Sequence, residues 1–156
     1  MGARDALAQL IQCQPRHFAV ADLDTALHEK CVSPSQLDDI FANVLAKYRV
    51  LRGQIDARAD AGQESVLRQI ILEAGMSCDI QVTMRGVGCV VAPADSDAHH
   101  KSWEQHIRDR TRDRILAGQG HLTLRVLYQD IMFDPAGVVS AIRELVHICR
   151  EGSYRA

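Results

Sequence analysis

Apolar residues recur at helical spacing over residues 3–12, 18–30 and 37–45. The third stretch follows Ser33-Pro34-Ser35-Gln36, which joins a capping serine, a proline suited to the first helical position and a glutamine that can complete a capping box. The pattern predicts three short amphipathic helices. None of them carries an obvious chemical motif, so we expect them to serve in packing.

The periodicity disappears over residues 48–62, where glycine and charged residues accumulate, and we interpret this stretch as a connector. Helical spacing returns over residues 63–74, and Gly75 stands where a helix would end. Glu64 falls in the first turn of this helix, where the helix dipole favours a carboxylate.

Strict alternation of apolar and polar residues predicts a half-buried strand over residues 78–84. A glycine-containing turn follows, and residues 89–92 form a second short strand, which predicts a hairpin ending at Pro93. A polar loop over residues 94–102 comes next.

The last third of the chain predicts a helix, a strand and a helix. The helix over residues 103–118 should bury Trp103, Ile107 and Leu116 and end at Gly118 and Gly120, residues 121–127 alternate as a strand, and Asp134-Pro135 begins the final helix. A strand, a helix and a strand in succession imply a right-handed crossover and a parallel strand pair beside the hairpin.

These elements together predict an α/β fold. A small mixed sheet flanked by helices should follow an α-helical N-terminal part. The predicted boundaries are 1–60 for the helical part, 61–150 for the α/β domain and 151–156 for a tail.

The composition of the chain limits the classes of function that it can have. The chain has 156 residues, 47% of them hydrophobic, and a net charge of −2, so any affinity for nucleic acid has to come from a local arginine surface. The five cysteines form no C-x-x-C motif, and we interpret them as buried, reduced thiols of a cytoplasmic protein. We expect no membrane partner, because no apolar run approaches the roughly 20 residues of a membrane span. The sequence contains no phosphate-binding loop, nucleophile elbow or dinucleotide glycine motif.

Residues 108–114 contain four arginines and two aspartates. One interpretation is a solvated helix in which aspartates and arginines pair at short range, each pair contributing only a few tenths of a kcal/mol. The other is a surface that faces phosphate, since the arginine side chain binds phosphate through two parallel hydrogen bonds.

The loop over residues 94–102 concentrates side chains of the kinds that bind metals, among them Asp95, His99 and His100. Hydrolysis of a phosphodiester with a divalent ion needs carboxylates on the metal and a base near the attacking water, which Glu64, Asp95 and one histidine could supply. The same composition also suits a plain surface loop. A zinc site is a further alternative, although the spacings match no standard zinc pattern; its ligands would come from Cys89, His99, His100, His106 and His121.

Several short motifs share one family context. They are Gln63-Glu64-Ser65-Val66-Leu67 ahead of Ala74-Gly75, Ala94-Asp95-Ser96 ahead of the histidine pair, the run Arg108-Asp109-Arg110-Thr111-Arg112-Asp113, and Leu124-Arg125-Val126 ahead of Gln129-Asp130. Through them residues 63–148 resemble the endonuclease-like domain related to very-short-patch-repair endonucleases, a branch of the restriction-endonuclease-like, PD-(D/E)xK superfamily. That domain occurs C-terminally in abortive-infection antitoxin-like actinobacterial proteins.

The resemblance implies a DNA endonuclease that uses Mg²⁺. Glu64 and Asp95 would hold the metal, and His99 and His100 would lie near the scissile phosphate. The nucleic-acid contacts would come from Lys101, Arg108, Arg112 and Arg125. Pro93 stands where the family pattern has a glutamate, and the strand aspartate has no counterpart.

We therefore predict a nuclease-like, nucleic-acid-associated module with a degenerate active site, in a regulatory or phage-defence setting, whose partner is DNA or a protein. One alternative is an active magnesium-dependent DNA endonuclease. The other is a protein-interaction or regulatory domain that makes no contact with DNA.

Overall fold

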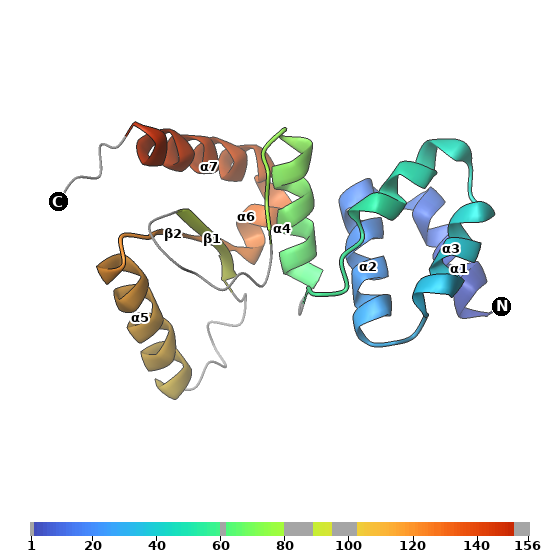
Figure 1. The fold of residues 1–156 in the computed structure, drawn as a ribbon, viewed down its shortest axis with the longest axis horizontal. Coiled ribbons are helices and arrows are strands. Elements are labelled where there is room, and N and C mark those ends of the chain that lie inside the picture. The colour runs from blue at the N-terminus through green and yellow to red at the C-terminus, as the bar shows by residue number, and fades with distance from the viewer. Residues whose placement is uncertain (1, 60–61, 80–88, 95–102, 152–156) are drawn as a thin grey trace. The chain divides into compact units, whose positions relative to one another are not determined.

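The structure is a computed structural model that describes residues 2–59, 62–79, 89–94 and 103–151 (Figure 1). The chain divides into two compact units, Met1–Val82 and Thr83–Ala156. The sequence placed this boundary after residue 60. In the structure it falls later, because the helix that begins at Gly62 packs against the N-terminal helices.

In its described residues, the first unit has helices as its only regular secondary structure. Its elements are α1 (Ala3–Cys13), α2 (Arg16–His28), α3 (Pro34–Ala42), the 3₁₀ helix η1 (Ala46–Gln54) and α4 (Gly62–Glu73). The three predicted N-terminal helices and the predicted helix over residues 63–74 are confirmed. The apolar faces of α1, α2, α3 and η1 form one core, whose members include Ile11, Val20, Leu23, Leu37, Ile40, Phe41 and Leu51.

Helix α3 begins as its sequence predicts. The backbone N–H of Gln36 donates to the Ser33 hydroxyl at 3.2 Å, and the Ser33 N–H donates to Gln36 Oε1 at 2.9 Å. Pro34 occupies the first helical position, where the N–H that it lacks would have no partner inside the helix. Two exposed donors at the helix start are therefore satisfied by side chains.

The interpretation of residues 48–62 as a plain connector is wrong. Much of this stretch lies in η1, and Leu51 is only 1% exposed because it enters the core of the first unit. The 3₁₀ repeat of three residues per turn differs from the α-helical repeat, so an α-helical template does not detect it.

A buried charge pair links α2 to α4. Asp24, which is fully buried, accepts hydrogen bonds from Arg68 Nη2 at 2.9 Å and from the Asp56 backbone N–H at 2.6 Å. Arg68 also donates to the Gln54 carbonyl, so the same guanidinium holds the end of η1. Burial raises the pKa of Asp24, while Ser65, the Asp56 N–H and Arg68 lower it. The Ser65 contact is weak, because its hydroxyl makes no hydrogen bond of full geometry.

The second unit is built around two strands. Its elements are β1 (Cys89–Ala94), α5 (Trp103–Gly118), β2 (Leu122–Leu127), α6 (Tyr128–Phe133) and α7 (Pro135–Arg150). The strands pair in parallel, from Cys89 opposite Leu122 to Ala94 opposite Leu127, which confirms the predicted parallel pair. The strand pair lies between α7 and α5 (Figure 1).

The predicted fold class is wrong. The described residues are mostly helical, and β1 and β2 are the only strands in them, so they do not form a mixed sheet flanked by helices. Of the strand expected over residues 78–84, Cys78 and Asp79 have no strand structure, and residues 80–84 lie outside the described residues. Within the described residues, the sheet on which the endonuclease-like architecture was predicted is therefore not present.

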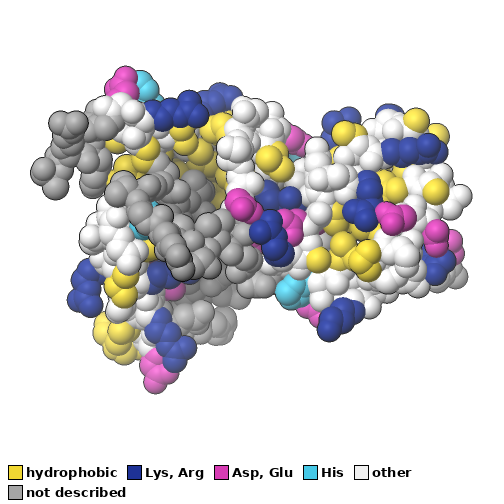
Figure 2. Space-filling view, viewed as in Figure 1, with side chains coloured by type: hydrophobic (Ala, Val, Ile, Leu, Met, Phe, Trp, Pro, Cys, Tyr) yellow, Lys and Arg dark blue, Asp and Glu magenta, His cyan; other side chains and the backbone are white. Residues whose placement is uncertain are grey.

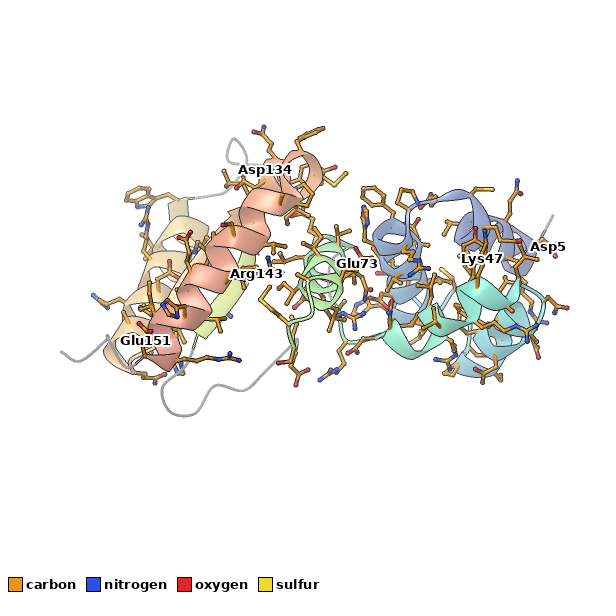
Figure 3. The ribbon with its side chains drawn as sticks, turned by 90° about the horizontal axis from the view of Figure 1, so that it is seen from above. Asp5, Lys47, Glu73, Asp134, Arg143 and Glu151 are labelled. Atoms are coloured by element: carbon orange, nitrogen blue, oxygen red, sulfur yellow. The ribbon has the colours of Figure 1, made fainter. Side chains whose placement is uncertain are left out.

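Two local predictions in the second unit have different outcomes. Pro93 does not end β1, which continues to Ala94; a proline is tolerated in a strand where the amide that it lacks points away from the partner strand. Helix α7 begins as predicted, with Pro135 in the first turn and Asp134 Oδ1 accepting from the Gly137 N–H at 3.0 Å. Figure 3 labels Asp134 and Glu151 at the two ends of this helix.

The interpretation of the cysteines as buried, reduced thiols is confirmed only in part: Cys13, Cys31 and Cys78 are free thiols, but they are not fully buried. Cys13 and Cys31 are exposed, Cys78 is half-buried, and Cys149 is disulfide-bonded. None of the helices in the described ranges is long and apolar enough to cross a membrane.

Candidate nucleic-acid interface

The predicted site residues that the structure describes are divided between the two units. Asp95, His99, His100 and Lys101 lie outside the described residues. Glu64 is half-buried in the first turn of α4, in the first unit. Within the described ranges, no three His, Cys, Asp or Glu side chains form a group that could hold a metal ion. The magnesium site therefore stays a prediction.

The three predicted arginines belong to the second unit, where two of them share a surface. Arg108 and Arg112 lie one turn apart on α5 and line the same shallow groove. Arg125 lies on β2, with its side chain directed to the aspartates of α5. Arg125 therefore has a different role from Arg108 and Arg112: it pairs with carboxylates of α5, whereas the two helix arginines line a groove.

Helix α5 is held at its C-terminal end. Leu116 is 7% exposed, and the His121 N–H donates to the Leu116 carbonyl at 2.9 Å across the turn that ends the helix. Gly120 has φ +81°, a left-handed conformation that glycine adopts without the steric cost of a Cβ. The predicted end of the helix at Gly118 and Gly120 is confirmed. The turn leads directly into β2.

Arg125 engages both aspartates of α5. Its Nη2 lies 2.8 Å from Asp113 Oδ1 and its Nε 3.1 Å from Asp113 Oδ2, a two-pronged contact, while its Nη1 lies 4.0 Å from Asp109. The hydrogen bonds from Arg125 hold the pKa of Asp113 below its ordinary value. Asp113 is therefore a carboxylate at neutral pH, and it fastens α5 to β2.

The arginines of α5 consequently have different surroundings from those that the sequence suggested. No ion pair among the described residues joins Asp109 or Asp113 to the arginines of the helix itself, which are Arg108, Arg110, Arg112 and Arg114. Helix α5 carries four arginines and three carboxylates. When Arg125 is counted with them, the net charge is +2 with histidine neutral. The surface of α5 is basic although the whole chain is slightly acidic.

Large apolar side chains are exposed on the same helix. Trp103 is 77% exposed, Ile107 48% and Ile115 53%. Figure 2 shows hydrophobic and basic side chains lying side by side along α5. The prediction that Trp103 and Ile107 are buried is wrong, whereas Leu116 is buried as expected.

Ile107 and Thr111 form a ridge with a shallow groove on each side. The first groove, of about 360 Å³, is lined among the described residues by Ile107, Arg108, Thr111, Arg112, Ile115 and Leu116. The second, of about 570 Å³, is lined by Trp103, Ile107, Arg110, Thr111 and Arg114. Each groove thus combines apolar walls with two arginines one helical turn apart.

The sequence contained a signal for this exposure. A helix that buries one face needs an apolar stripe about 100° wide, with three or four apolar residues in every two turns. Over its 16 residues, α5 has only four large apolar side chains, and apart from Ala117 and Gly118 the other residues are polar. The helix is too polar to bury Trp103 and Leu116 together. Leu116, at the end that adjoins β2, is buried, and Trp103, at the other end, is exposed.

His121, an alternative zinc ligand, is buried in the second unit. It is 5% exposed, and neither ring nitrogen has a hydrogen-bond partner. It belongs to no cluster of metal-binding side chains in the part of the chain that the structure describes.

Comparison with protein-family models, with curated proteins and with solved structures finds no match to this chain.

Proposed function

We propose that this protein is a nucleic-acid-binding module whose contact surface is the exposed side of α5. The observation that carries the proposal is the exposed Trp103 on a helix whose arginines line two apolar-walled grooves. Arginine supplies paired donors for phosphate, and an exposed aromatic ring supplies a stacking surface for bases. A protein partner would also bury the apolar residues, but phosphate accounts for the arginine pairs as well.

The electrostatics support the same proposal. The Arg125 contacts engage Asp113 and Asp109, which would otherwise repel phosphate or pair with the arginines of the helix. Arginines at an exposed surface interact weakly with isolated carboxylates but gain from the dense charge of a nucleic-acid backbone, because binding releases condensed counterions. The proposal concerns binding and includes no cleavage step.

Fluorescence anisotropy with a labelled oligonucleotide tests the proposal. We expect affinity to fall with salt, with a log–log slope of roughly −2.8 to −3.6 if all four helix arginines meet phosphates, at about −0.7 to −0.9 for each contact. The double variants Arg108→Gln/Arg112→Gln and Arg110→Gln/Arg114→Gln should each weaken binding and make that slope shallower by about 1.5.

A charge-matched control separates this surface from general charge. Arg16→Gln/Arg150→Gln removes two exposed arginines from α2 and α7 and should leave binding close to that of the unmodified protein. Equal losses in the control and the α5 variants would overturn the assignment of the surface. If no oligonucleotide is bound at 50 mM salt, the proposal is wrong and the protein-interaction alternative replaces it.

A further inference from the structure

We infer that the ligand is a single-stranded nucleic acid, with a base stacked on Trp103 and the adjoining backbone held by Arg110 and Arg114. This inference rests on the proposed function and names its substrate class. The three side chains line one groove, the larger of the two on α5.

The exposure of Trp103 is the first argument. The side chain stands at the first residue of α5 and is 77% exposed, so much of the indole is open to a planar group. Stacking needs a free base face, and in a duplex each face is covered by the neighbouring base pairs. A single strand offers free faces, and stacking on an aromatic ring tolerates any base, since every base has a π-face.

The spacing along the helix is the second argument. Arg110 and Arg114 lie one turn apart, with about 5–6 Å between their Cβ atoms, and Trp103 lies about two turns before Arg110, roughly 10 Å along the axis. All three line the same side of the Ile107–Thr111 ridge. A strand running along α5 would therefore meet the stacking surface and then two phosphate contacts in succession.

The volume of the groove agrees with this arrangement. At about 570 Å³ it lies within the range of sites that take small molecules or short segments of a chain. Trp103 and Ile107 provide apolar surface for a base, and the arginines and Thr111 provide polar groups for the sugar and phosphate. Among the described residues, the groove on the other side of the ridge is lined by Arg108 and Arg112 but by no aromatic side chain. We assign that groove to phosphate contacts that do not distinguish single strands from duplexes.

The sequence provides a specific probe, because Trp103 is the only tryptophan. Unlabelled 15-nucleotide oligo(dT) and oligo(U) and a 15-base-pair duplex are titrated at 150 mM salt while Trp103 emission is recorded, with free N-acetyl-tryptophanamide as the control for quenching unrelated to binding. Both single strands should quench the emission in a saturable way, and the duplex should do so little. A difference between oligo(dT) and oligo(U) would show whether the site prefers DNA or RNA.

Anisotropy of Trp103→Ala and Trp103→Phe completes the test. Alanine should weaken single-strand binding roughly 5- to 150-fold and leave duplex binding unchanged, while phenylalanine, which still stacks, should recover most of the affinity. Because the side chain is so exposed, the circular dichroism of both variants should match that of the unmodified protein.

The failures of the inference and of the proposed function are distinguishable. If duplex and single strand bind equally, or if Trp103→Ala changes nothing while the α5 arginine variants still weaken binding, the single-strand inference is overturned and the proposed function stands. If neither form of nucleic acid binds, the proposed function is overturned with it.

Discussion

Replacing Arg68 by methionine should destabilise the first unit more than any loss of an exposed ion pair. The substitution keeps much of the side-chain volume but removes the hydrogen bonds to Asp24 and to the Gln54 carbonyl. It leaves a fully buried carboxylate with the Asp56 N–H as its main donor. Removing one partner of a buried pair in this way costs about 3–5 kcal/mol of the free energy of unfolding.

The loss should depend on pH. Burial already raises the pKa of Asp24 above its value in the unfolded chain, and Arg68 limits that increase. The stability that Asp24 contributes is therefore full below its unfolded pKa and is lost as pH rises through its folded pKa. Without Arg68 the folded pKa rises further, so Arg68→Met should cost most near pH 7 and less as the solution is acidified toward pH 4.5.

Urea unfolding followed by far-ultraviolet circular dichroism measures both effects. Arg52→Met is the matched control, because Arg52 pairs with Asp38 at 2.8 Å but the Arg52 side chain is 37% exposed and the Asp38 side chain 65%, and its loss should cost under about 1 kcal/mol. The double variant Asp24→Asn/Arg68→Met should recover part of the stability, since no charge is left buried. A loss below about 1 kcal/mol for Arg68→Met, or one that is equal at pH 4.5 and pH 7, would refute the reasoning.

Two further predictions concern titration and thiol chemistry. Arg125→Gln should raise the pKa of Asp113 toward its ordinary value, and the ¹³C shift of the carboxyl group measures this change. In the unmodified protein, the Asp113 carboxylate contributes stability above its unfolded pKa, and this stability is lost as pH falls through its folded pKa. The substitution should reduce that contribution. An unchanged Asp113 titration would contradict the geometry. Iodoacetamide labelling read by peptide mass should modify the exposed Cys13 and Cys31 first, and Cys78 more slowly at pH 7.5, because burial raises the pKa of its thiol. If Cys78 reacts as fast as Cys13, its burial is misjudged.

Local signals in the sequence predicted helix ends well. The cap at Ser33, the Asp134-Pro135 start and the turns at Gly75 and Gly120 follow from backbone donors and glycine conformation, which depend on a few neighbouring residues. The parallel pairing of β1 with β2 was also predicted from the sequence, because a strand, a helix and a strand in succession can be connected in only a few ways.

The fold class and the site were harder to predict, for a physical reason. Alternation over residues 78–84 specifies a strand only if a partner strand is available, and Cys78 and Asp79 lie outside any strand. Trp103 was assigned to the core because large apolar residues are usually buried, yet the polar composition of α5 leaves it exposed. The resemblance to an endonuclease rested on short motifs, which carry no information on whether a sheet exists to position them.

The two-pronged contact of Arg125 has a consequence for locating surface function from a linear sequence. Residues 103–118 taken alone carry four arginines and three carboxylates, a net charge of only +1. Arg125, on the neighbouring strand, adds to the basic character of the helix. A search of the sequence for basic segments therefore underestimates the positive charge at α5. A synthetic peptide with the sequence of α5 would lose that contribution, and its aspartates would be left to neighbouring arginines three and four residues away. The proposed binding surface therefore depends on the folded unit, and the isolated helix would not reproduce it.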